Sequence, residues 1–449
     1  MGKYFGTDGF RGEANKVLTV EHAFKIGRYL GWYYGRDHRA RVVIGKDTRR
    51  SSYMLEYALC AGLTASGADA CLMHVTSTPS VSYIARSDDF DCGIMISASH
   101  NPYQDNGIKL INCDGEKMGD EVLDLVEHYI DGGEELPLAT GADIGSTVDY
   151  SAGRNRYIGY LISLATRSFK GWKVGLDCAN GSTWMMAKSV FDALGADTHV
   201  ISNRPDGLNI NVDCGSTHIE NLQRFVRDNQ LDIGFAFDGD ADRCIAVDEH
   251  GEVVNGDGIM YVCAKYMLEN GSFGKSKVVT TVMSNMGLYK ALDELGIGYE
   301  QTAVGDKYVA ENMRANGHLI GGEQSGHIIF GRLASTGDGL LTAIKVMEAV
   351  IESKQPLSKL VSGMSVYPQV LKNVVVTDKD AALACPAVKD AVAKAERELG
   401  ADGRVLLRKS GTEPVLRVMA EAGTAELCEE KVDAIIEAMR VSGMLIKVR

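Results

Sequence analysis

The feature that most constrains the fold of this 449-residue chain is the alternation of short β-branched runs with segments of helical periodicity. Residues 41–45 (Arg-Val-Val-Ile-Gly) have the composition of a strand, and residues 52–65 carry apolar side chains at helical spacing. Residues 70–75 and 93–97 predict two further strands. Strand–helix–strand order is typical of parallel or mixed sheets covered by helices. We therefore predict an α/β fold.

The same order starts again twice further along the chain. Residues 172–177 and 231–237 predict strands, and a helix that ends near Leu194 lies between them. The third start has a strand at 277–282 and a helix at 287–295. Because the order of elements recurs and the sequence itself does not, we interpret the three starts as separate α/β domains.

The C-terminal part follows a different order. Three strands are predicted in succession, at 374–377, 404–408 and 415–418, and a long amphipathic helix follows at 425–439. This order is typical of an α+β domain. We therefore predict three α/β domains with mixed sheets and one smaller C-terminal α+β domain, with the boundaries 1–150, 151–254, 255–367 and 368–449.

Composition limits the partners and the location of the chain. The net charge of −13 argues against nucleic acid or an anionic membrane as the main partner. The sequence has no apolar run long enough to span a membrane, and its start lacks the apolar core of a signal peptide. The ten cysteines are scattered singly, which predicts reduced, buried thiols and no zinc site. We expect a cytoplasmic protein.

The segment Asp238-Gly-Asp-Ala-Asp-Arg243 is the strongest chemical signal in the sequence. Three carboxylates alternate along a loop between two predicted strands, and such close like charges repel one another unless a cation neutralises them. Hard oxygen ligands suit Mg²⁺. A solvated acidic turn is the alternative, whereas an EF-hand is excluded because Arg243 occupies the position that needs glycine. We expect Gly239 to let the backbone turn tightly.

Ser99 is a candidate nucleophile. It lies in the segment 96–102 (Ile-Ser-Ala-Ser-His-Asn-Pro), directly after a predicted strand, where α/β proteins commonly carry reactive groups. His100 is its neighbour, but no Gly-x-Ser-x-Gly elbow surrounds it. A polar turn closed by Asn-Pro is the alternative interpretation. Lys109 follows ten residues later, and the loop between them can bring it back to the same place.

Three more loops have the composition of ligand-binding turns. Residues 321–327 (Gly-Gly-Glu-Gln-Ser-Gly-His) can hydrogen-bond sugar hydroxyls or an amine, unless they form only a tight polar turn. Residues 408–414 (Arg-Lys-Ser-Gly-Thr-Glu-Pro), with Arg417, offer donors for phosphate, unless they form only a capped turn. Near the N-terminus, glycines flank Arg11. The common chemistry of these loops is phosphoryl transfer on a small anionic substrate.

These segments, in this order, resemble the α-D-phosphohexomutase superfamily over essentially the whole chain. The motifs that carry the resemblance are SASHNP at 97–102, DGDADR at 238–243, GEQSGH at 322–327 and RKSGTEP at 408–414. Within the superfamily, the chain is most similar to the bacterial phosphoglucosamine mutase family. The supporting features are GTDGFRG at 6–12, VGDKYV at 304–309, Gln324 and STGDGL at 335–340.

The resemblance implies a heart-shaped, four-domain phosphohexomutase architecture with the active site in a central cleft and a hinged last domain. It implies that Ser99 is phosphorylated, that Lys109 is a general acid/base, and that His100, Arg11 and Arg243 support the phosphoryl group. The Mg²⁺ ligands it implies are Ser99, Asp238, Asp240 and Asp242. The implied sugar-binding residues are Glu323, Ser325 and His327. The implied phosphate-binding residues are Arg408, Ser410, Gly411, Thr412 and Arg417.

The implied reaction is that of an isomerase, an intramolecular phosphotransferase that interconverts glucosamine 6-phosphate and glucosamine 1-phosphate. It proceeds through a phosphoserine enzyme and a glucosamine 1,6-bisphosphate intermediate, and it feeds the synthesis of UDP-N-acetylglucosamine and cell-wall precursors. A homodimer is common in the family, although nothing in these residues demands one. The segment 111–117 departs from the family pattern, and we expect it not to touch the chemistry.

Three competing interpretations stay open at this point. The first is a mutase of the same superfamily that acts on glucose or mannose phosphates, against which Gln324 argues. The second is a non-catalytic protein that only binds sugar phosphates, which should have lost Ser99, Lys109 or an aspartate of the acidic loop. The third is a Mg²⁺-dependent phosphatase, which would release inorganic phosphate and leave its substrate unisomerised.

Overall fold

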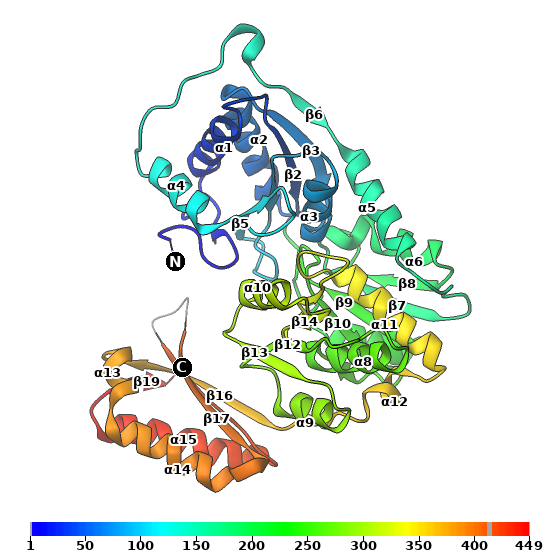
Figure 1. Ribbon diagram of the computed structural model, residues 1–449, viewed down its shortest axis with the longest axis vertical. Coiled ribbons are helices and arrows are strands. Elements are labelled where there is room, and N and C mark those ends of the chain that lie inside the picture. Colours follow the sequence, from blue (N-terminus) through cyan, green and yellow to red (C-terminus); the bar gives the residue numbers. More distant parts are fainter. Residues whose placement is uncertain (1, 411–414, 449) are drawn as a thin grey trace. The chain divides into compact units, whose positions relative to one another are not determined.

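The computed structural model describes residues 2–410 and 415–448, and the chain folds into two compact units (Figure 1). The first unit comprises Met1–Met283 and Ile297–Gly363, and the second comprises Ser284–Gly296 and Met364–Arg449. Three sheets lie in the first unit and one lies in the second. A short internal segment therefore packs with the C-terminal part of the chain.

The N-terminal sheet has six strands in the order β1-β5-β4-β2-β3-β6. Strand β2 pairs in parallel with β3 and β4, whereas β5 pairs antiparallel with β4 and β1, so the sheet is mixed. Its strands are β1 (Phe10–Glu13), β2 (Arg41–Lys46), β3 (Asp69–Val75), β4 (Cys92–Ile96), β5 (Asp105–Asn112) and β6 (Thr147–Asp149). Its helices are α1 (Val20–Tyr34), α2 (Arg50–Ala65), α3 (Thr78–Ser87), α4 (Asp120–Ile130) and the 3-10 turn η1 (Gly141–Asp143).

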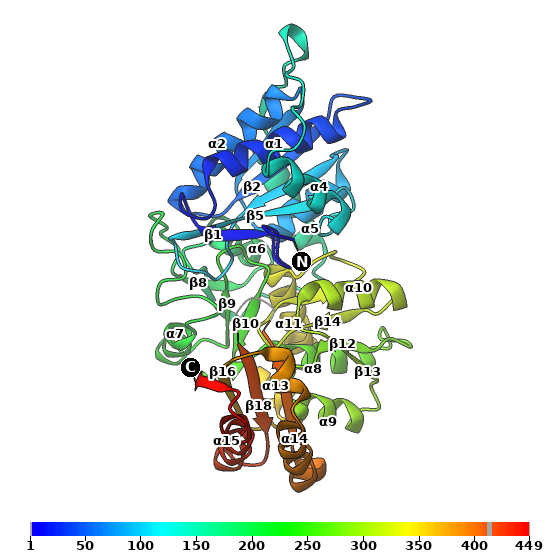
Figure 2. The same ribbon diagram turned by 90° about the vertical axis from the view of Figure 1, so that its left-hand side faces the viewer.

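The apolar run of β2 explains why this sheet is covered on both faces. Successive side chains of a strand point to opposite faces. Val42 and Ile44 pack into the core under α1 and α2, and Val43 packs with Val81 of α3 on the other face. Helices α1 and α2 lie side by side along one face (Figure 2). A strand buried on both faces is expected to carry a continuous apolar run, as β2 does at Val42, Val43 and Ile44 between its charged ends.

The second sheet has the order β11-β10-β9-β7-β8. Strand β7 pairs in parallel with β8 and β9, and β10 pairs antiparallel with β9 and β11. Its strands are β7 (Lys173–Asp177), β8 (Asp197–Ile201), β9 (Ile233–Phe237), β10 (Cys244–Val247) and β11 (Val253–Val254). Its helices are α5 (Ser151–Ser163), η2 (Ser182–Met185), α6 (Ala187–Ala193) and α7 (Glu220–Asp228).

The third sheet has the order β13-β12-β14-β15, with β15 antiparallel and the other pairs parallel. Its strands are β12 (Val278–Thr281), β13 (Tyr299–Thr302), β14 (Ile320–Gly322) and β15 (Ile328–Phe330). The helices of this region are α8 (Gly256–Glu269), α10 (Asp306–Asn316), α11 (Gly339–Ser353) and α12 (Leu357–Val361).

The second unit is an antiparallel sheet with the order β17-β18-β16-β19. Helices α14 and α15 lie side by side against it (Figure 2). Its strands are β16 (Gln369–Val376), β17 (Arg404–Lys409), β18 (Leu416–Glu421) and β19 (Leu445–Val448). Its helices are α9 (Met286–Glu294), α13 (Lys379–Ala384), α14 (Pro386–Leu399), η3 (Gly400–Asp402) and α15 (Ala425–Val441).

The predicted fold class is confirmed: three mixed α/β sheets are followed by an antiparallel α+β part. One predicted helix differs, because the segment that ends near Leu194 is divided into η2 and α6 at Met186. All ten cysteines are free thiols, and eight of them are buried. Over residues 2–410 and 415–448, each helix is too short or too polar to cross a lipid bilayer.

Candidate active site

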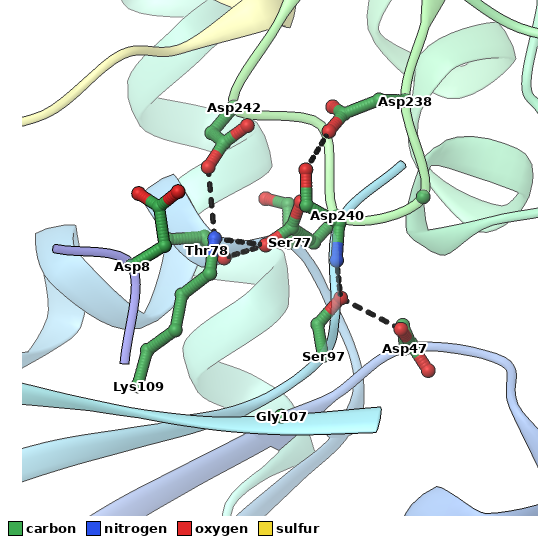
Figure 3. Close-up of polar contacts among 12 residues, drawn as sticks. Asp8, Asp47, Ser77, Thr78, Ser97, Gly107, Lys109, Asp238, Asp240 and Asp242 are labelled. Atoms are coloured by element: carbon green, nitrogen blue, oxygen red, sulfur yellow. Dashed lines mark hydrogen bonds and ion pairs between the residues drawn. The ribbon is translucent and has the colours of Figure 1, made fainter. Parts of the chain in front are cut away.

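The Ser99 loop and the acidic loop meet in the first unit, at the ends of strands from two sheets (Figure 3). Ser99 follows β4, and Lys109 lies on β5 of the same sheet. The three aspartates of the acidic loop lie between β9 and β10 of the second sheet. Strand-end loops of α/β sheets are the usual place for a ligand site.

Ser99 is held in a strained backbone conformation that directs its hydroxyl group at the acidic loop. Its φ is 53°, in the left-handed region, where a residue with a side chain is disfavoured by about 1–2 kcal/mol. The Ser99 N–H donates to Ser97 Oγ at 2.9 Å, and Ser99 Oγ donates to Asp238 Oδ2. Nδ1 of His100 lies 3.3 Å from Ser99 Oγ. The side chain is 1% exposed, so this orientation is imposed by the surrounding protein.

The acidic loop forms a compact cluster of buried carboxylates. Asp238, Asp240 and Asp242 each place one carboxylate oxygen within 4.8 Å of the others. Burial, followed by the charges of Asp242 and Asp240, raises the pKa of Asp238 well above its ordinary value. The pKa of Asp242 is lowered, because the charges of Lys109, His327 and Arg243 outweigh the opposing effect of burial.

The cluster fits a divalent cation. Oδ1 of Asp240 and Oδ1 of Asp242 are buried and have no hydrogen-bond partner among the described residues. A buried, unpaired carboxylate oxygen is costly, and a cation with hard oxygen ligands removes that cost. The three aspartates can therefore hold a metal ion of the Mg²⁺ type.

Lys109 reaches the acidic cluster from β5 (Figure 3). Its Nζ lies 2.6 Å from Asp240 Oδ2 and 2.9 Å from Asp242 Oδ2. Burial alone would lower the pKa of Lys109, but the two carboxylates outweigh it and the pKa lies above its ordinary value. Lys109 is therefore protonated while both contacts last.

Thr78 makes a further contact to the cluster, although no sequence motif indicated it. Its N–H donates to the main-chain oxygen of Asp240 at 3.0 Å, and its Oγ1 donates to Asp240 Oδ2. Thr78 is the first residue of α3, after the capping residue Ser77. The Ser-Thr-Pro sequence after a strand signalled this helix start, but not its contact with a loop more than a hundred residues away.

The charges of two arginines, Arg243 and Arg11, act on His100, the neighbour of Ser99. Arg11 lies on β1 opposite Gly107 and 3.7 Å from Asp8 Oδ2, and the Arg243 N–H donates to Asp238 Oδ1 at 3.2 Å. The Nε atoms of Arg11 and Arg243 are buried without a hydrogen-bond partner among the described residues. Burial, followed by the charges of Arg243 and Arg11, lowers the pKa of His100 to about 4. Arg11 and Arg243 can therefore bind an anion, and the imidazole of His100 beside them is neutral at neutral pH.

The predicted sugar-binding residues lie in the turn between β14 and β15. The Gly305 N–H donates to Glu323 Oε1 at 3.2 Å, and His327 Nε2 lies 3.3 Å from Asp306 Oδ2. Burial is the main reason that the pKa of Glu323 is raised. Ser325 lines a shallow hollow that Arg243 also lines. Glu323 and His327 therefore contact the start of α10, whereas Ser325 lines the hollow that it shares with Arg243.

Lys117 corrects the expectation that the segment 111–117 lies away from the chemistry. Its Nζ lies 2.6 Å from Asp306 Oδ1, 3.2 Å from Asp8 Oδ1 and 2.7 Å from the Thr7 oxygen. The burial of Lys117 is outweighed by the charges of Asp306 and Asp8, so its pKa is raised. A cavity of about 360 Å³ is lined by Lys117, Asp8 and Asp306 and also by Lys109 and Asp242.

The predicted phosphate-binding residues belong to the second unit. Arg408 on β17 lies directly opposite Arg417 on β18. Burial, followed by the charge of Arg417, lowers the pKa of Arg408. Two cations this close favour an anion between or beside them. Ser410 is buried, and Gly411 and Thr412 lie outside the described residues.

Buried polar residues that no sequence motif indicated support the Ser99 loop. Arg49 and Asn211 donate to main-chain oxygens of this loop, and Asp47 accepts from Arg49 and Ser97. All four side chains are buried. Asp47 and Arg49 lie within four residues of the end of the predicted strand at 41–45, and polar residues just after a strand are the signal that could have indicated them.

Comparison with known proteins supports a single family over the whole chain. Models of the phosphoglucomutase/phosphomannomutase family match residues 2–136 (alpha/beta/alpha domain I), 155–251 (domain II), 255–367 (domain III) and 371–438 (C-terminal domain). The chain is 64% identical over 444 residues to the phosphoglucosamine mutase of Lachnoclostridium phytofermentans, and the match covers 99% of each chain.

Two solved structures have the same fold. A phosphoglucomutase/phosphomannomutase family protein from Burkholderia thailandensis matches with a TM-score of 0.84 and 25% identity, over 98% of this chain and 97% of the other. The N-acetylphosphoglucosamine mutase of Aspergillus fumigatus, solved with GlcNAc-6P and magnesium, matches with a TM-score of 0.70 and 18% identity, over 98% and 96%. The resemblance inferred from the motifs is confirmed. With these four domains and this full-length identity, the chain belongs to the phosphoglucosamine mutase family of phosphohexomutases.

Proposed function

We propose that this protein interconverts glucosamine 6-phosphate and glucosamine 1-phosphate through a phosphoserine at Ser99. Family membership makes the chain an enzyme of the isomerase class. The observation that carries the proposal is the hydrogen bond from Ser99 Oγ to Asp238, which joins the nucleophile to the carboxylate cluster. The substrate follows from the full-length identity to a phosphoglucosamine mutase.

The reaction consists of two phosphoryl transfers of opposite direction. In the first, the bond between phosphorus and Ser99 Oγ breaks while phosphorus bonds to the free hydroxyl oxygen of the sugar. The sugar hydroxyl loses a proton and Ser99 Oγ gains one, which yields the 1,6-bisphosphate. After the bisphosphate has turned end over end, its other phosphate returns to Ser99. The sum is an isomerisation that consumes neither water nor phosphate.

Asp238, Asp240 and Asp242 are proposed to hold Mg²⁺, together with an oxygen of the phosphorylated Ser99. The unpaired Oδ1 atoms of Asp240 and Asp242 support this assignment. When bound, Mg²⁺ supplies neutralisation of the charge on the phosphoryl group. Arg11 and Arg243 are proposed to bind the phosphoryl oxygens, because their charges act on His100 beside Ser99 and their buried Nε atoms have no hydrogen-bond partner among the described residues. His100 is proposed to act as a neutral hydrogen-bonding group, consistent with its low pKa.

Lys109 is proposed as the acid that protonates the leaving Ser99 oxygen and as the base in the return transfer. Its raised pKa supports the acid role, since the proton is present at neutral pH. A base role requires that Asp240 and Asp242 be engaged elsewhere, because their charges keep the proton on Nζ. One lysine can fill both roles, because the return transfer takes from Ser99 the proton that the first transfer gives to it.

Recognition of the substrate is assigned to two groups of residues. Glu323, Ser325 and His327 are proposed to bind the sugar, and the carboxylate of Glu323 is the natural partner for the ammonium group of glucosamine. Arg408, Ser410, Gly411, Thr412 and Arg417 are proposed to bind the phosphate that does not react. The facing guanidinium groups of Arg408 and Arg417 support that role.

The location and assembly of the protein are proposed as well. Ten free thiols fit a reducing compartment, so we infer a cytoplasmic location. The reaction product is a precursor for nucleotide-activated amino sugar and cell-wall synthesis. A homodimer, expected from the resemblance alone, stays a prediction that light scattering tests.

The decisive experiment compares substrates side by side. The purified, Mg²⁺-supplied enzyme is assayed with glucosamine 6-phosphate, glucose 6-phosphate and mannose 6-phosphate, each primed with its 1,6-bisphosphate. We expect kcat/KM to favour the amino sugar by about tenfold or more, because a site built for an ammonium group discriminates against substrates that lack it. A preference for glucose or mannose would keep the mechanism but assign the chain to the phosphoglucomutase/phosphomannomutase branch.

The matched control is Ser99→Ala, which keeps the backbone and removes the nucleophile. We expect it to fold and to lose turnover by about 1,000-fold or more. Release of inorganic phosphate by the wild-type enzyme without isomerisation would instead identify a phosphatase.

A further inference from the structure

The Ser99 loop is held by an arrangement of donors that the proposed chemistry does not use. Arg49 Nη2 donates to the main-chain oxygens of Ser99 at 3.1 Å and Asn101 at 2.6 Å. Asn211 Nδ2 donates to the same two oxygens, at 2.8 Å and 3.1 Å. A carbonyl oxygen accepts two hydrogen bonds, so these two nitrogen atoms satisfy both oxygens completely.

The two donors approach from different parts of the fold. Arg49 lies between β2 and α2 of the first sheet, fully buried, and its charge is balanced by the carboxylate of Asp47. Asn211 lies in the irregular segment between β8 and α7 of the second sheet and is 6% exposed. The Asn211 N–H donates to the Ala179 oxygen at 2.9 Å, which fixes this segment to the loop after β7.

Asn211 also contacts the acidic loop. A Cβ atom on Gly239 would lie 2.5 Å from the Ser99 oxygen and 3.1 Å from Asn211 Nδ2. The Ser99 carbonyl, the Asn211 amide and the Gly239 backbone are therefore packed against one another. Any shift of the Ser99 loop relative to Asp238 would have to break these contacts.

We propose that Asn211 is a positioning residue for phosphoryl transfer, which clamps the Ser99 loop in its left-handed conformation and so keeps Ser99 Oγ on Asp238. The proposal rests on the function proposed for Ser99. Ser99 needs external hydrogen bonds to stay at a φ of 53°, because relaxation to negative φ would turn its Cα–Cβ bond away from the cluster. Asn211 supplies these bonds from the same sheet that carries the three aspartates.

The sharpest test is Asn211→Gly, since Asn211 itself has a φ of 59° that glycine adopts without strain. This variant removes the amide and leaves the backbone free to keep its course. Asp213→Gly is the matched control, because Asp213 is exposed on the same segment, has a φ of 50° and directs its side chain to solvent. A second variant, Asn211→Asp, keeps the shape of the side chain but places a carboxylate against two carbonyl oxygens.

Each protein is incubated with Mg²⁺ and glucose 1,6-bisphosphate, and the phosphorylation of Ser99 is followed by intact mass. Turnover of glucosamine 6-phosphate is measured in parallel. We expect Asn211→Gly to slow both phosphorylation and kcat by about 10- to 100-fold while KM stays within about twofold, because misplacement of a reacting atom affects the transfer step. Asn211→Asp should be slower still, and Asp213→Gly should match the wild type.

The possible results distinguish a failure of the role proposed for Asn211 from a failure of the function proposed for Ser99. A melting temperature lowered equally in both glycine variants, with transfer rates equal to the wild type, would overturn the positioning role of Asn211. So would a raised KM with unchanged kcat, which would assign Asn211 to substrate binding. A wild-type protein that accepts no phosphoryl group from the bisphosphate would contradict the proposed function itself.

Discussion

At the scale of single residues, the geometry of the site depends on which residues adopt a left-handed backbone conformation, with positive φ. We expected Gly239 to be the tight turn of the acidic loop, but the residue with positive φ there is Ala241, at 61°. Gly239 is required for another reason, because a Cβ atom would lie 2.5 Å from the Ser99 oxygen. The sequence motif marks both positions, yet it does not reveal which steric constraint applies to which residue.

This distinction predicts that a substitution at Gly239 is damaging and that one at Ala241 is nearly neutral. Gly239→Ala should displace the Ser99 loop and reduce the rate of Ser99 phosphorylation by about tenfold or more. Ala241→Gly should change the free energy of unfolding by less than about 1 kcal/mol, because relief of the strained φ offsets the loss of a buried methyl group. Phosphorylation followed by intact mass, together with thermal unfolding, checks both. If Ala241→Gly proved the more damaging of the two, the steric assignment would be wrong.

At the scale of elements, helix α11 begins at a buried acid. Asp338 accepts from the Leu341 N–H at 2.9 Å, and Tyr157 Oη of α5 donates to Asp338 Oδ2 at 2.7 Å. Burial raises the pKa of Asp338 to about 6. The folded protein therefore binds a proton at Asp338 more tightly than the unfolded chain does, and this group destabilises the fold once it is ionised.

The sign of this effect is testable by pH. A raised folded pKa gives stability that is complete below the unfolded value near 4 and is lost as the pH rises through about 6. The difference of about two pKa units corresponds to about 3 kcal/mol at most. Asp338→Asn keeps the cap and removes the titration. We expect the melting temperature of the wild type, relative to Asp338→Asn, to fall between pH 4.5 and 7.5, and a constant difference would refute the shift.

Lys117 shows how one side chain connects three elements. It joins the N-terminal loop to the start of α10, and Asp306 connects it to His327. We expect Lys117→Met to raise KM for glucosamine 6-phosphate by about tenfold, since the charge that orients Asp306 is lost. Lys307→Met is the control, because Lys307 pairs with the exposed Asp120 in the same region. Equal KM values in the two variants would show that Lys117 has no such role.

The elements were predictable because β-branched runs and helical periodicity are local signals. The strands at β2, β4, β7 and β9 follow from their apolar composition. The proposed site residues were found through motifs, and the structure places Ser99, Lys109 and the three aspartates together. Asn211, Thr78 and Lys117 could not be predicted in the same way. Each of them contacts residues more than a hundred positions away, and a segment without periodicity carries no signal of a long-range contact.

At the scale of the whole molecule, the two units are not consecutive in the chain. Ser284–Gly296 leaves the first unit and packs with the C-terminal part. Glu421, fully buried on β18, accepts from the Met286 N–H at 3.0 Å and from Asn285 Nδ2 at 3.3 Å, and Arg404 Nε lies 2.6 Å away. The chain therefore passes between the units three times, near residues 283, 296 and 363.

Because the second unit contains two separate stretches of the chain, we expect the enzyme to tolerate a cut in its main chain. A protease site inserted after Gly363 would divide the polypeptide into two fragments, yet the larger fragment keeps α9 and the segment before it, against which the smaller one packs. We expect the nicked protein to elute as one species in native buffer and to separate only in denaturant. Release of residues 364–449 in native buffer would contradict this. We therefore expect the second unit to stay assembled without a covalent link at residue 363, because non-covalent packing joins its two separate stretches of chain.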